Sequence, residues 1–408
     1  MKKSEFFRNA RHDLPGPLAG VRVLECTTSW AGPMCAAVLG DLGADVVKVE
    51  IPCGEIARQL VPMFPGTKVS FGHGTVNRNK RSLSVDLRKP EGREIFLKVA
   101  AKSDIVVENF KVGTMDKWGV GYEAVREAKP DIVYVSITGW GQFGPYHTLP
   151  GYDALAQAAS GFLSLNGAPE GPPTKAPTYL GDDLAGLHGA IGAIAALRHR
   201  DQTGEGQHVD VALLDSILFQ SNGLPTLAAM GIEPTRMGNQ YGIAVPANVF
   251  ECKDGLQVYI GILLDAHWKI LARTIGYPEL ADDPAFETLS GRAERRDVCN
   301  AIVAGWLAER TRAEALKIFG EVGIAAAPVN SYAEAARDSH VKERDMLQPT
   351  RLEDGSTVPL VGPAAKFSRT PIRVRAGAAA LGQHNDEILS EIGIDARQRK
   401  KLKATGII

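Results

Sequence analysis

The chain has 408 residues, 44% of them hydrophobic, and carries 46 Lys and Arg side chains against 47 Asp and Glu. A length of this order predicts two or three compact units, and the balanced charge argues against nucleic acid or an anionic membrane as a partner. No apolar run reaches the roughly 18 residues of a membrane span, and residues 1–16 are basic without the apolar core of a signal peptide. These features predict a cytoplasmic globular protein.

The cysteines show no disulfide or metal-site pattern, because their number is odd and no Cys-x-x-Cys pair occurs. We therefore expect reduced thiols in the core and no metal centre. The five are Cys26, Cys35, Cys53, Cys252 and Cys299.

Residues 20–50 predict a βαβ unit, in which an apolar strand is followed by the polar loop "TTSWAGP", a helix entered near Pro33, and a second strand at Asp45–Glu50. Continuous apolar strands of this kind are typical of a parallel sheet that is covered on both faces. We therefore expect an α/β domain. Its further expected elements are strands at 104–110 and 131–140 and helices at about 90–102 and 114–128.

The stretch "GWGQFG" at 139–144 matches the dinucleotide fingerprint G-x-G-x-x-G and follows an expected strand. That fingerprint needs a helix directly after the glycines, because the first turn of the helix holds the pyrophosphate. Here Pro145 and a polar loop follow, and no acidic residue ends a following strand at the right distance. The sequence argues against NAD binding and favours a mobile glycine-rich loop over an active site.

Two adjacent aspartates stand at the start of the glycine-rich run "YLGDDLAGLHGAIGAIAALRHR", residues 179–200. Its apolar residues at three-and-four spacing predict a helix. A glycine in a helix costs roughly 1 kcal/mol against alanine, so these glycines indicate that another element approaches closely. Asp183 is a candidate helix cap, since a carboxylate accepts first-turn N–H groups. One cap needs one carboxylate, which leaves Asp182 free for another role.

After a further expected strand at 206–215, the pattern changes to short alternating strands around Asp-Gly turns, a strong hairpin signal. Together with the helices that follow, this predicts a smaller α+β domain at about 230–330. The closing stretch at 384–408 is charged and helical, which predicts a packed helix. The hairpins are expected at 248–262 and 351–358, and the helices near 265–276, 293–309 and 312–320.

Six blocks in order along the chain resemble the class III coenzyme A transferases, the group of formyl-CoA and carnitine-CoA transferases. The resemblance covers about 17–220 and resumes in "GIAAAPVNSYAEAARDSHVKERDML" and "GQHNDEIL", so the middle third matches least. The blocks are "WAGPMCAAVLGDLGADVVKVE", "NRNKRSLSVDL", "VENF", "GYDALAQAASG", "YLGDDLAGLHGAIGAIAAL" and "TGEGQHVDV".

The resemblance implies a large Rossmann-like, CoA-binding domain over 1–220, to which residues 335–408 return, and a small α+β domain over 230–330. It further implies a ring-like subunit in an interlocked homodimer. Acyl-CoA and a carboxylic acid would be the substrates, and no permanently bound cofactor is implied.

In that family the aspartate of the "GD" before the glycine-rich helix is the nucleophile, and the matching residue is Asp182. A carboxylate with an ordinary pKa of about 3.9 is ionised at neutral pH and needs no general base. Attack on an acyl-CoA would give an aspartyl anhydride and then an aspartyl-CoA thioester, without ATP or metal. Tyr152 and Asp153 match the family's tyrosine–acid pair and are expected to position the acyl group.

The resemblance also implies that the nucleotide and pantetheine parts of CoA lie along "TTSWAGP", along "NKR" and beside "VENF". From the residues alone, Asn109 can also be a turn residue, Phe110 a core residue, and Lys80 and Arg81 solvated charges. The expected coenzyme-binding residues are Thr28, Ser29, Trp30, Ala31, Asn79, Lys80, Arg81, Asn109, Phe110 and Lys117.

Two departures from the family pattern concern the substrate. The glycine run with which formyl-CoA enzymes shield the anhydride is replaced by "RMGNQYGIAVPANVF" at 236–250, which argues against formyl-CoA. No arginine follows Glu50 directly, as it does in some members, and Arg58 is the candidate replacement. The resemblance to this family favours succinyl-CoA as donor and a dicarboxylate or aryl-substituted acid as acceptor.

Two other functions stay open at this point. A CoA-thioester 2-epimerase or racemase of the same superfamily exchanges the α-proton through a His and an Asp. Tyr152 stands where those enzymes carry histidine, and tyrosine is a poor base with a pKa of about 10. The other alternative is a non-catalytic CoA-binding protein, which would have no need of Asp182.

Overall fold

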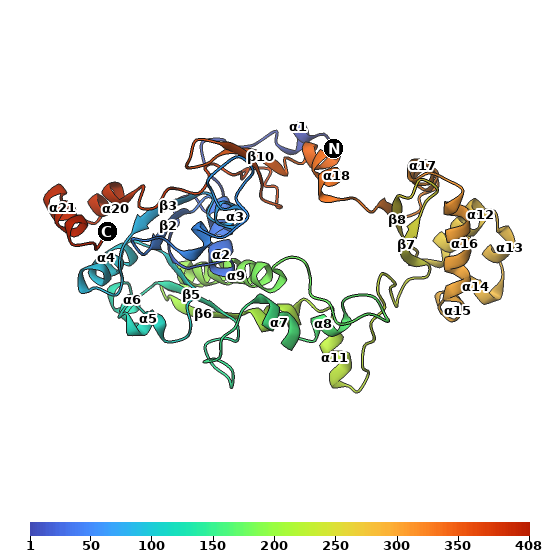
Figure 1. Cartoon of the computed structure of the whole chain (residues 1–408), viewed down its shortest axis with the longest axis horizontal. Coiled ribbons are helices and arrows are strands. Elements are labelled where there is room, and N and C mark those ends of the chain that lie inside the picture. Colours follow the sequence, from blue (N-terminus) through green and yellow to red (C-terminus); the bar gives the residue numbers. More distant parts are fainter. The chain divides into compact units, whose positions relative to one another are not determined.

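The computed structural model describes all 408 residues, which divide into two compact units (Figure 1). The first unit comprises Met1–Phe162, Lys175–Met230 and Ser339–Ile408, and the second comprises Leu163–Thr174 and Gly231–Asp338. The chain therefore leaves the first unit and returns to it. No helix combines the length and the apolar composition that crossing a bilayer requires.

The first unit is built on a six-stranded parallel sheet with the order β3-β2-β1-β4-β5-β6. This is the order of doubly wound nucleotide-binding folds, whose two halves diverge from β1, and it confirms the expected α/β class. The strands are β1 (Arg22–Cys26), β2 (Asp45–Glu50), β3 (Lys80–Ser84), β4 (Ile105–Glu108), β5 (Val133–Thr138) and β6 (Gln207–Ala212).

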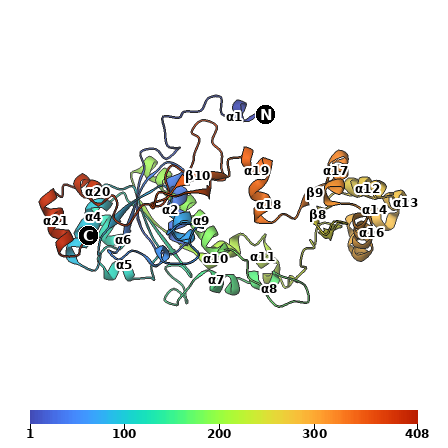
Figure 2. The same cartoon turned by 45° about the horizontal axis from the view of Figure 1, so that its top comes forward.

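Helices cover both faces of the sheet, as its continuous apolar strands require. On one face α2 (Ala31–Asp41) and α9 (Leu180–Thr203) enclose a core of small and branched side chains. On the other face lie α4 (Pro90–Ala100), α6 (Tyr122–Ala128) and α20 (Asn385–Glu391). Figures 1 and 2 show α20 beside α4 in both views.

Two expected helices are each divided in the structure. Residues 114–128 form α5 (Thr114–Lys117) and α6, which are separated at Gly119 with φ of +71°. The closing stretch forms α20 and α21 (Ala396–Ala404), separated at Gly393 with φ of +83°. Glycine adopts this left-handed backbone at little steric cost, and the helical ladder ends there.

The glycines of α9 allow two other elements to pack against its backbone. At Gly186 a Cβ would lie 3.0 Å from the carbonyl oxygen of Ala31, and at Gly189 it would lie 2.8 Å from Ile137 and 3.1 Å from Cys35. Both α2 and β5 therefore touch α9 closely, as its composition predicts.

The returning segment covers the open edge of β3. The Asn79 N–H donates to the carbonyl of Ala376 at 3.0 Å, and the His384 N–H donates to the carbonyl of Ser82 at 3.1 Å. An uncovered edge strand would be a template for pairing with another chain. Residues 376–385 close the sheet on this side.

In the second unit, β7 (Ala247–Glu251) and β8 (Gln257–Gly261) form the expected antiparallel hairpin, which β9 (Ala326–Pro328) extends. The second expected hairpin, β10 (Leu347–Arg351) with β11 (Thr357–Val361), belongs to the first unit. The helices that pack around the second unit's core are α12 (Asp265–Thr274), α13 (Pro278–Ala281), α14 (Pro284–Glu287), α15 (Leu289–Glu294), α16 (Arg296–Ala308) and α17 (Arg312–Val322).

All five cysteines are free thiols, and four are buried as expected. Cys53 is exposed, which corrects the expectation for it, because it lies in the loop after β2 rather than in the sheet.

The remaining short helices are α1 (Lys3–Phe6), η1 (Ile56–Arg58), α3 (Phe71–Val76), α7 (Asp153–Ala159), α8 (Phe162–Leu165), α10 (Leu213–Phe219), α11 (Leu224–Ala229), α18 (Tyr332–Arg337) and α19 (Ser339–Glu343).

Candidate active site

The carboxyl ends of β1 and β4 border the point where the strand order reverses, which is where doubly wound folds bind their ligands. The loops that follow these strands are tied together. The Thr28 N–H donates to Oδ1 of Asn109 at 2.8 Å, and the Asn109 amide donates to the carbonyl of Thr28 at 2.8 Å. The structure thus joins two of the expected coenzyme-binding segments.

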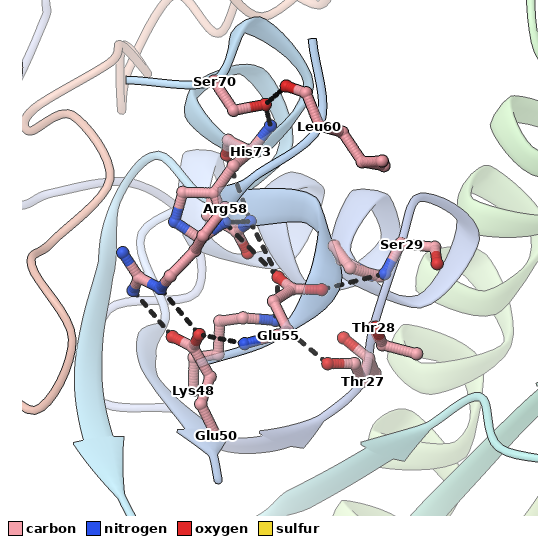
Figure 3. A network of polar contacts seen from close by, with 12 residues as sticks. Thr27, Thr28, Ser29, Lys48, Glu50, Glu55, Arg58, Leu60, Ser70 and His73 are labelled. Carbon is pink, nitrogen blue, oxygen red and sulfur yellow. Dashed lines mark hydrogen bonds and ion pairs between the residues drawn. The ribbon is translucent and has the colours of Figure 1, made fainter. Parts of the chain in front are cut away.

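A buried ionic network holds the first of these loops in shape. Ser29 has a left-handed φ of 67°, which is uncommon outside glycine, and its N–H donates to the Glu55 carboxylate at 2.9 Å. Glu55 pairs with Lys48 at 3.1 Å, and Lys48 pairs with Glu25 at 3.1 Å. Figure 3 shows Glu55 at the centre of these contacts, with Ser29 beside it.

The charges of this network balance within the buried volume. Lys80 pairs with Glu25 at 2.7 Å, so two lysines face two glutamates. Burial acts to raise the pKa of Glu55, but Lys48 and other neighbours outweigh it and lower that pKa. For Lys80 burial dominates and lowers the pKa to about 8. These residues shape the loop after β1.

Arg58 forms a bidentate ion pair with Glu50. Its Nε and Nη2 each donate to the Glu50 carboxylate at 2.7 Å, and Nη2 also donates to the carbonyl of Ala379 at 3.0 Å. Bidentate pairs of this kind are among the strong charge-assisted contacts. The residue that the sequence offers as a replacement for the family's arginine is therefore engaged within the chain.

A side-chain hydrogen bond connects the amino ends of α2 and α9. The indole Nε1–H of Trp30, directly before α2, donates to Oδ1 of Asp183 at 2.7 Å. The Trp30 ring also meets the Tyr179 ring edge to face, with centroids 4.9 Å apart. The loop after β1 is therefore held against the first turn of α9.

The cap of α9 comes from another segment of the chain. Oδ1 of Asp153 accepts the Gly181 N–H at 2.7 Å, and Oδ2 accepts the Gln157 amide at 2.8 Å. The cap expected at Asp183 is wrong, because that carboxylate, in the fourth residue of the helix, bonds to Trp30 instead.

The remaining carboxylate, that of Asp182, is half-buried in the first turn of α9, and no N–H or O–H of the chain donates to it. Burial first, and then the negative charges of Asp153 and Asp183, raise the pKa of Asp182 to about 7. The ordinary value that the sequence suggests is therefore wrong, since both effects disfavour the ionised form. Such perturbed, unpartnered groups are typical of reactive sites.

The other expected site residues differ in their exposure and in their contacts. Tyr152 is 61% exposed directly before α7. Phe110 is half-buried and meets the Trp118 ring at 5.0 Å. Lys117, at the end of α5, is exposed and forms no ion pair. Ala31 begins α2 and is buried against α9.

The "NKR" residues all have partners within the chain. Asn79 is buried and donates to Asp41 at 2.7 Å while accepting the Arg375 N–H at 2.6 Å. Lys80 belongs to the buried network, and Arg81 pairs with carboxylates that include Asp45 at 2.6 Å. In this structure their polar groups support the sheet edge.

The sequence analysis missed the buried network and the Trp30–Asp183 bond. The sequence holds a signal for the network, because Lys48 interrupts the apolar run "VVKV" within the strand at 45–50, and a buried charge needs a partner. Nothing in the sequence indicates the second, since its partners lie 153 residues apart.

The loop at 139–144 contains no helix, so the geometry of a dinucleotide fingerprint is absent. Its backbone is anchored where it leaves β5. The Gly141 N–H donates to Oγ1 of Thr138 at 2.9 Å, and the Gln142 N–H donates to the Asp210 carboxylate at 2.9 Å.

Comparisons with known proteins identify relatives of this chain. The model of CoA-transferase family III matches residues 18–385. The chain is 38% identical to the succinyl-CoA–L-malate CoA-transferase beta subunit of Chloroflexus aurantiacus, covering 96% of this chain and 98% of that protein. It is also 38% identical to the succinyl-CoA:mesaconate CoA-transferase of Haloarcula hispanica, and the match covers 93% of this chain and 97% of that protein. A CAIB/BAIF family protein from Brucella suis superposes with a TM-score of 0.82 at 34% identity, over 93% of this chain and all of that one.

Proposed function

Since the chain belongs to CoA-transferase family III, we propose that it moves CoA from succinyl-CoA to a second carboxylic acid, with Asp182 as the nucleophile. The observation that carries this proposal is the unpartnered Asp182 carboxylate in the first turn of α9, where Asp153 caps the helix and Trp30 holds the loop after β1 against it. The names of two relatives, which pair succinyl-CoA with malate or mesaconate, support this donor and a dicarboxylate acceptor.

The reaction needs two exchanges at one carboxylate. Asp182 attacks the thioester carbonyl, the C–S bond breaks, and an aspartyl-succinyl anhydride and CoA thiolate form. The thiolate attacks the aspartyl carbonyl, which releases succinate and leaves an aspartyl-CoA thioester. The acceptor carboxylate then attacks the aspartyl-CoA thioester, which releases CoA thiolate and forms a second anhydride between Asp182 and the acceptor. The thiolate attacks the acceptor carbonyl of this anhydride and forms the new acyl-CoA. Asp182 is regenerated as a carboxylate, and one thioester replaces another.

A substrate panel tests this function directly. The purified chain is incubated with succinyl-CoA or acetyl-CoA and with malate, mesaconate, other dicarboxylates and aryl-substituted acids, and new thioesters are identified by mass spectrometry. We expect a new acyl-CoA from succinyl-CoA and at least one dicarboxylate. Failure to form any new thioester would overturn the proposal.

The raised pKa of Asp182 predicts a pH dependence. Only the ionised carboxylate attacks, so kcat/KM is expected to rise about tenfold for each pH unit below about 7 and to level off above it. The Asp183→Asn variant keeps an acceptor for Trp30 but removes a like charge, so its inflection is expected at lower pH. A group with a pKa of about 7 titrates over roughly pH 5.5 to 8. A kcat/KM that stays constant over this range in both proteins would contradict the assignment of Asp182.

We assign the pantetheine arm to the loops that meet at β1 and β4, because their backbone is fixed and they lead to α9 through Trp30. Asp153 acts as a positioning residue through the Gly181 N–H, and Tyr152 is exposed beside it. No observation in the structure favours the racemase alternative. The residues assigned to CoA here are Thr28, Ser29, Trp30, Ala31, Asn109, Phe110 and Lys117.

We also propose that the chain forms a homodimer. Large apolar side chains are exposed on the first unit, and exposed apolar surface marks interaction surfaces where it is contiguous. Light scattering at micromolar concentration is expected to give twice the 43.7 kDa chain mass, and a monomeric mass would contradict it. The exposed side chains include Phe143, Tyr152, Tyr179, Phe219 and Met230.

A further inference from the structure

A chain of buried polar side chains crosses three strands of the sheet, and the chemistry at Asp182 does not involve it. Glu108, at the end of β4, is 5% exposed, and Ser136, its partner in register on β5, is 1% exposed. The Ser136 hydroxyl is hydrogen-bonded to the Glu108 carboxylate and lies 2.9 Å from Nε2 of His208. Because His208 is exposed on the edge strand β6, the chain of hydrogen bonds runs from the surface to the interior.

This chain lies on the face of the sheet opposite α2 and α9. Side chains alternate between the two faces along a strand, and Val106 and Tyr134, each two residues earlier, belong to the core on the side of α4 and α6. Glu108 and Ser136 therefore face that side. They are separated from Asp182 by the sheet itself.

Glu108 changes its charge near neutral pH. Burial raises its pKa to about 7, although hydrogen bonds from Ser136 and from the Phe110 N–H act in the opposite direction. The negative charges of Asp116 on α5 and Asp210 on β6 raise this pKa further. No lysine or arginine pairs with Glu108, so its negative charge is not compensated.

The other titratable groups that face Glu108 are neutral. Cys26 is its partner in register on β1, and burial raises the pKa of the Cys26 thiol. Burial also raises the pKa of the Tyr134 hydroxyl and lowers the pKa of His208. Within this cluster, Glu108 is therefore the group that gains or loses a proton near pH 7.

Ser136 can satisfy Glu108 in both protonation states. A hydroxyl donates one hydrogen bond while accepting another, and Nε2 of a neutral imidazole donates in one tautomer and accepts in the other. When Glu108 is ionised, His208 donates to Ser136 and Ser136 donates to the carboxylate. When Glu108 is protonated, its O–H donates to Ser136, and Ser136 donates to His208. The reversal moves protons only.

Glu108 also holds the loop that follows β4. Its Oε2 accepts the Phe110 N–H at 2.9 Å, and the residue between them, Asn109, exchanges two hydrogen bonds with Thr28. An ionised acceptor forms the stronger hydrogen bond. The loop is therefore fixed more firmly when Glu108 is ionised.

We propose that Glu108 is a positioning residue for this loop, and that its ionisation, accommodated by Ser136 and His208, raises the affinity of the chain for CoA. The proposal rests on the function argued above, in which the loop contacts the pantetheine arm. Glu108 itself touches no substrate and acts through the Phe110 N–H. A loop that is already fixed loses less freedom when the ligand binds, which is the physical reason for the tighter binding.

The test measures CoA affinity by titration calorimetry in two proteins, Asp182→Asn and the double variant Asp182→Asn with Glu108→Gln. Replacement of Asp182 removes the other carboxylate with a pKa of about 7. Gln keeps an acceptor for the Phe110 N–H but carries no charge. We expect equal affinities at about pH 6 and roughly fivefold tighter binding by the protein with Glu108 at about pH 8. The phosphate of CoA also titrates, with a pKa of about 6, but this affects both proteins equally and cancels in their ratio.

A second pair of variants, also made with Asp182→Asn, locates the titrating group. Asp210→Asn keeps an acceptor for the Gln142 N–H and removes a negative charge near Glu108, so the midpoint of the affinity change is expected at lower pH. The matched control, Asp201→Asn, removes the same charge in the last turn of α9, before the amino end of β6. Its midpoint is expected to equal that of Asp182→Asn alone.

The outcomes separate this proposal from the function on which it rests. If CoA is transferred but the affinity ratio does not change with pH, the positioning role is overturned and the transferase stands. Equal shifts of the midpoint in the Asp210 and Asp201 variants also overturn it, because a general charge effect would then explain them. If no protein binds CoA, the proposed function fails.

Amide exchange without ligand tests the positioning step by itself. The ratio of exchange rates at residues 109–113 between Glu108→Gln and wild type is expected to rise with pH, because only the wild type gains a charged acceptor. A ratio that stays constant from about pH 6 to about pH 8, where a group of this pKa titrates, would overturn the role of Glu108 whatever the ligand.

Discussion

Replacement of Asp182 by Asn is expected to lower CoA transfer by roughly 10³-fold or more, since removal of a nucleophile eliminates every later step. Asn keeps the size of the side chain, and no hydrogen bond to the carboxylate is lost, because the chain provides none. CoA binding and folding should therefore persist. Initial rates with succinyl-CoA and the acceptor found in the panel measure the effect, and intact mass excludes deamidation back to Asp.

The same variant is expected to be more stable than the parent at pH 8. The folded-state pKa of Asp182 is raised to about 7, whereas the unfolded chain has the ordinary value of about 3.9. The folded state therefore loses stability relative to the unfolded state as the pH rises from about 4 to about 7, and the loss is complete above that pH. The gain should thus be constant above about pH 7 and shrink as the pH falls from about 7 toward 4, and it is of the order of a few kcal/mol at its largest, at about 1.4 kcal/mol for each pH unit of the shift. Thermal unfolding at several pH values measures it.

The covalent step can also be located directly. Hydroxylamine intercepts anhydrides and thioesters, so it should convert Asp182 to its hydroxamate only when succinyl-CoA is present. Peptide mapping places the mass change, and fragmentation separates Asp182 from Asp183. Modification at Asp183 or Asp153, or normal turnover by Asp182→Asn, would show that the nucleophile is a neighbouring aspartate.

Replacement of Lys48 by Ala is expected to destabilise the chain by about 3–5 kcal/mol, the usual cost of removing one partner from a buried ion pair. Lys48 is 2% exposed and pairs with both Glu25 and Glu55. Burial lowers its pKa, but the surrounding glutamates outweigh this and raise it, so the charge is retained in the folded state. Urea unfolding measures the loss in free energy.

The matched control for this prediction is Lys98→Ala. Lys98 pairs with Glu94 at 2.7 Å on the surface of α4, with half of its side chain exposed, and such pairs contribute about 0.3–0.5 kcal/mol. If Lys48→Ala unfolds too far to measure, Glu55→Gln keeps an acceptor for the Ser29 N–H and should cost less, about 1–3 kcal/mol. A Lys48→Ala loss no larger than that of Lys98→Ala would show that the network does not stabilise the fold.

The helices and strands of the first unit follow from local pattern. The three-and-four spacing after Asp182 predicts the helix that the structure contains as α9, and the unbroken apolar strands predict a buried parallel sheet. Such patterns extend over a few residues, so they identify elements well. They identify helix ends less well, and the left-handed Gly119 and Gly393 divide two segments that read as continuous.

The chemistry of the site depends on contacts that no local pattern contains. The sequence determined that an aspartate pair opens a glycine-rich helix, and it predicted that Asp182 is free for another role. Only the tertiary structure decided that Asp153, from another segment, caps that helix, that Trp30 holds Asp183, and that the pKa of Asp182 stands at about 7. The reason is physical: spacing along the chain sets which residues share a helix face, whereas a pKa depends on burial and on charges that folding brings together from distant segments.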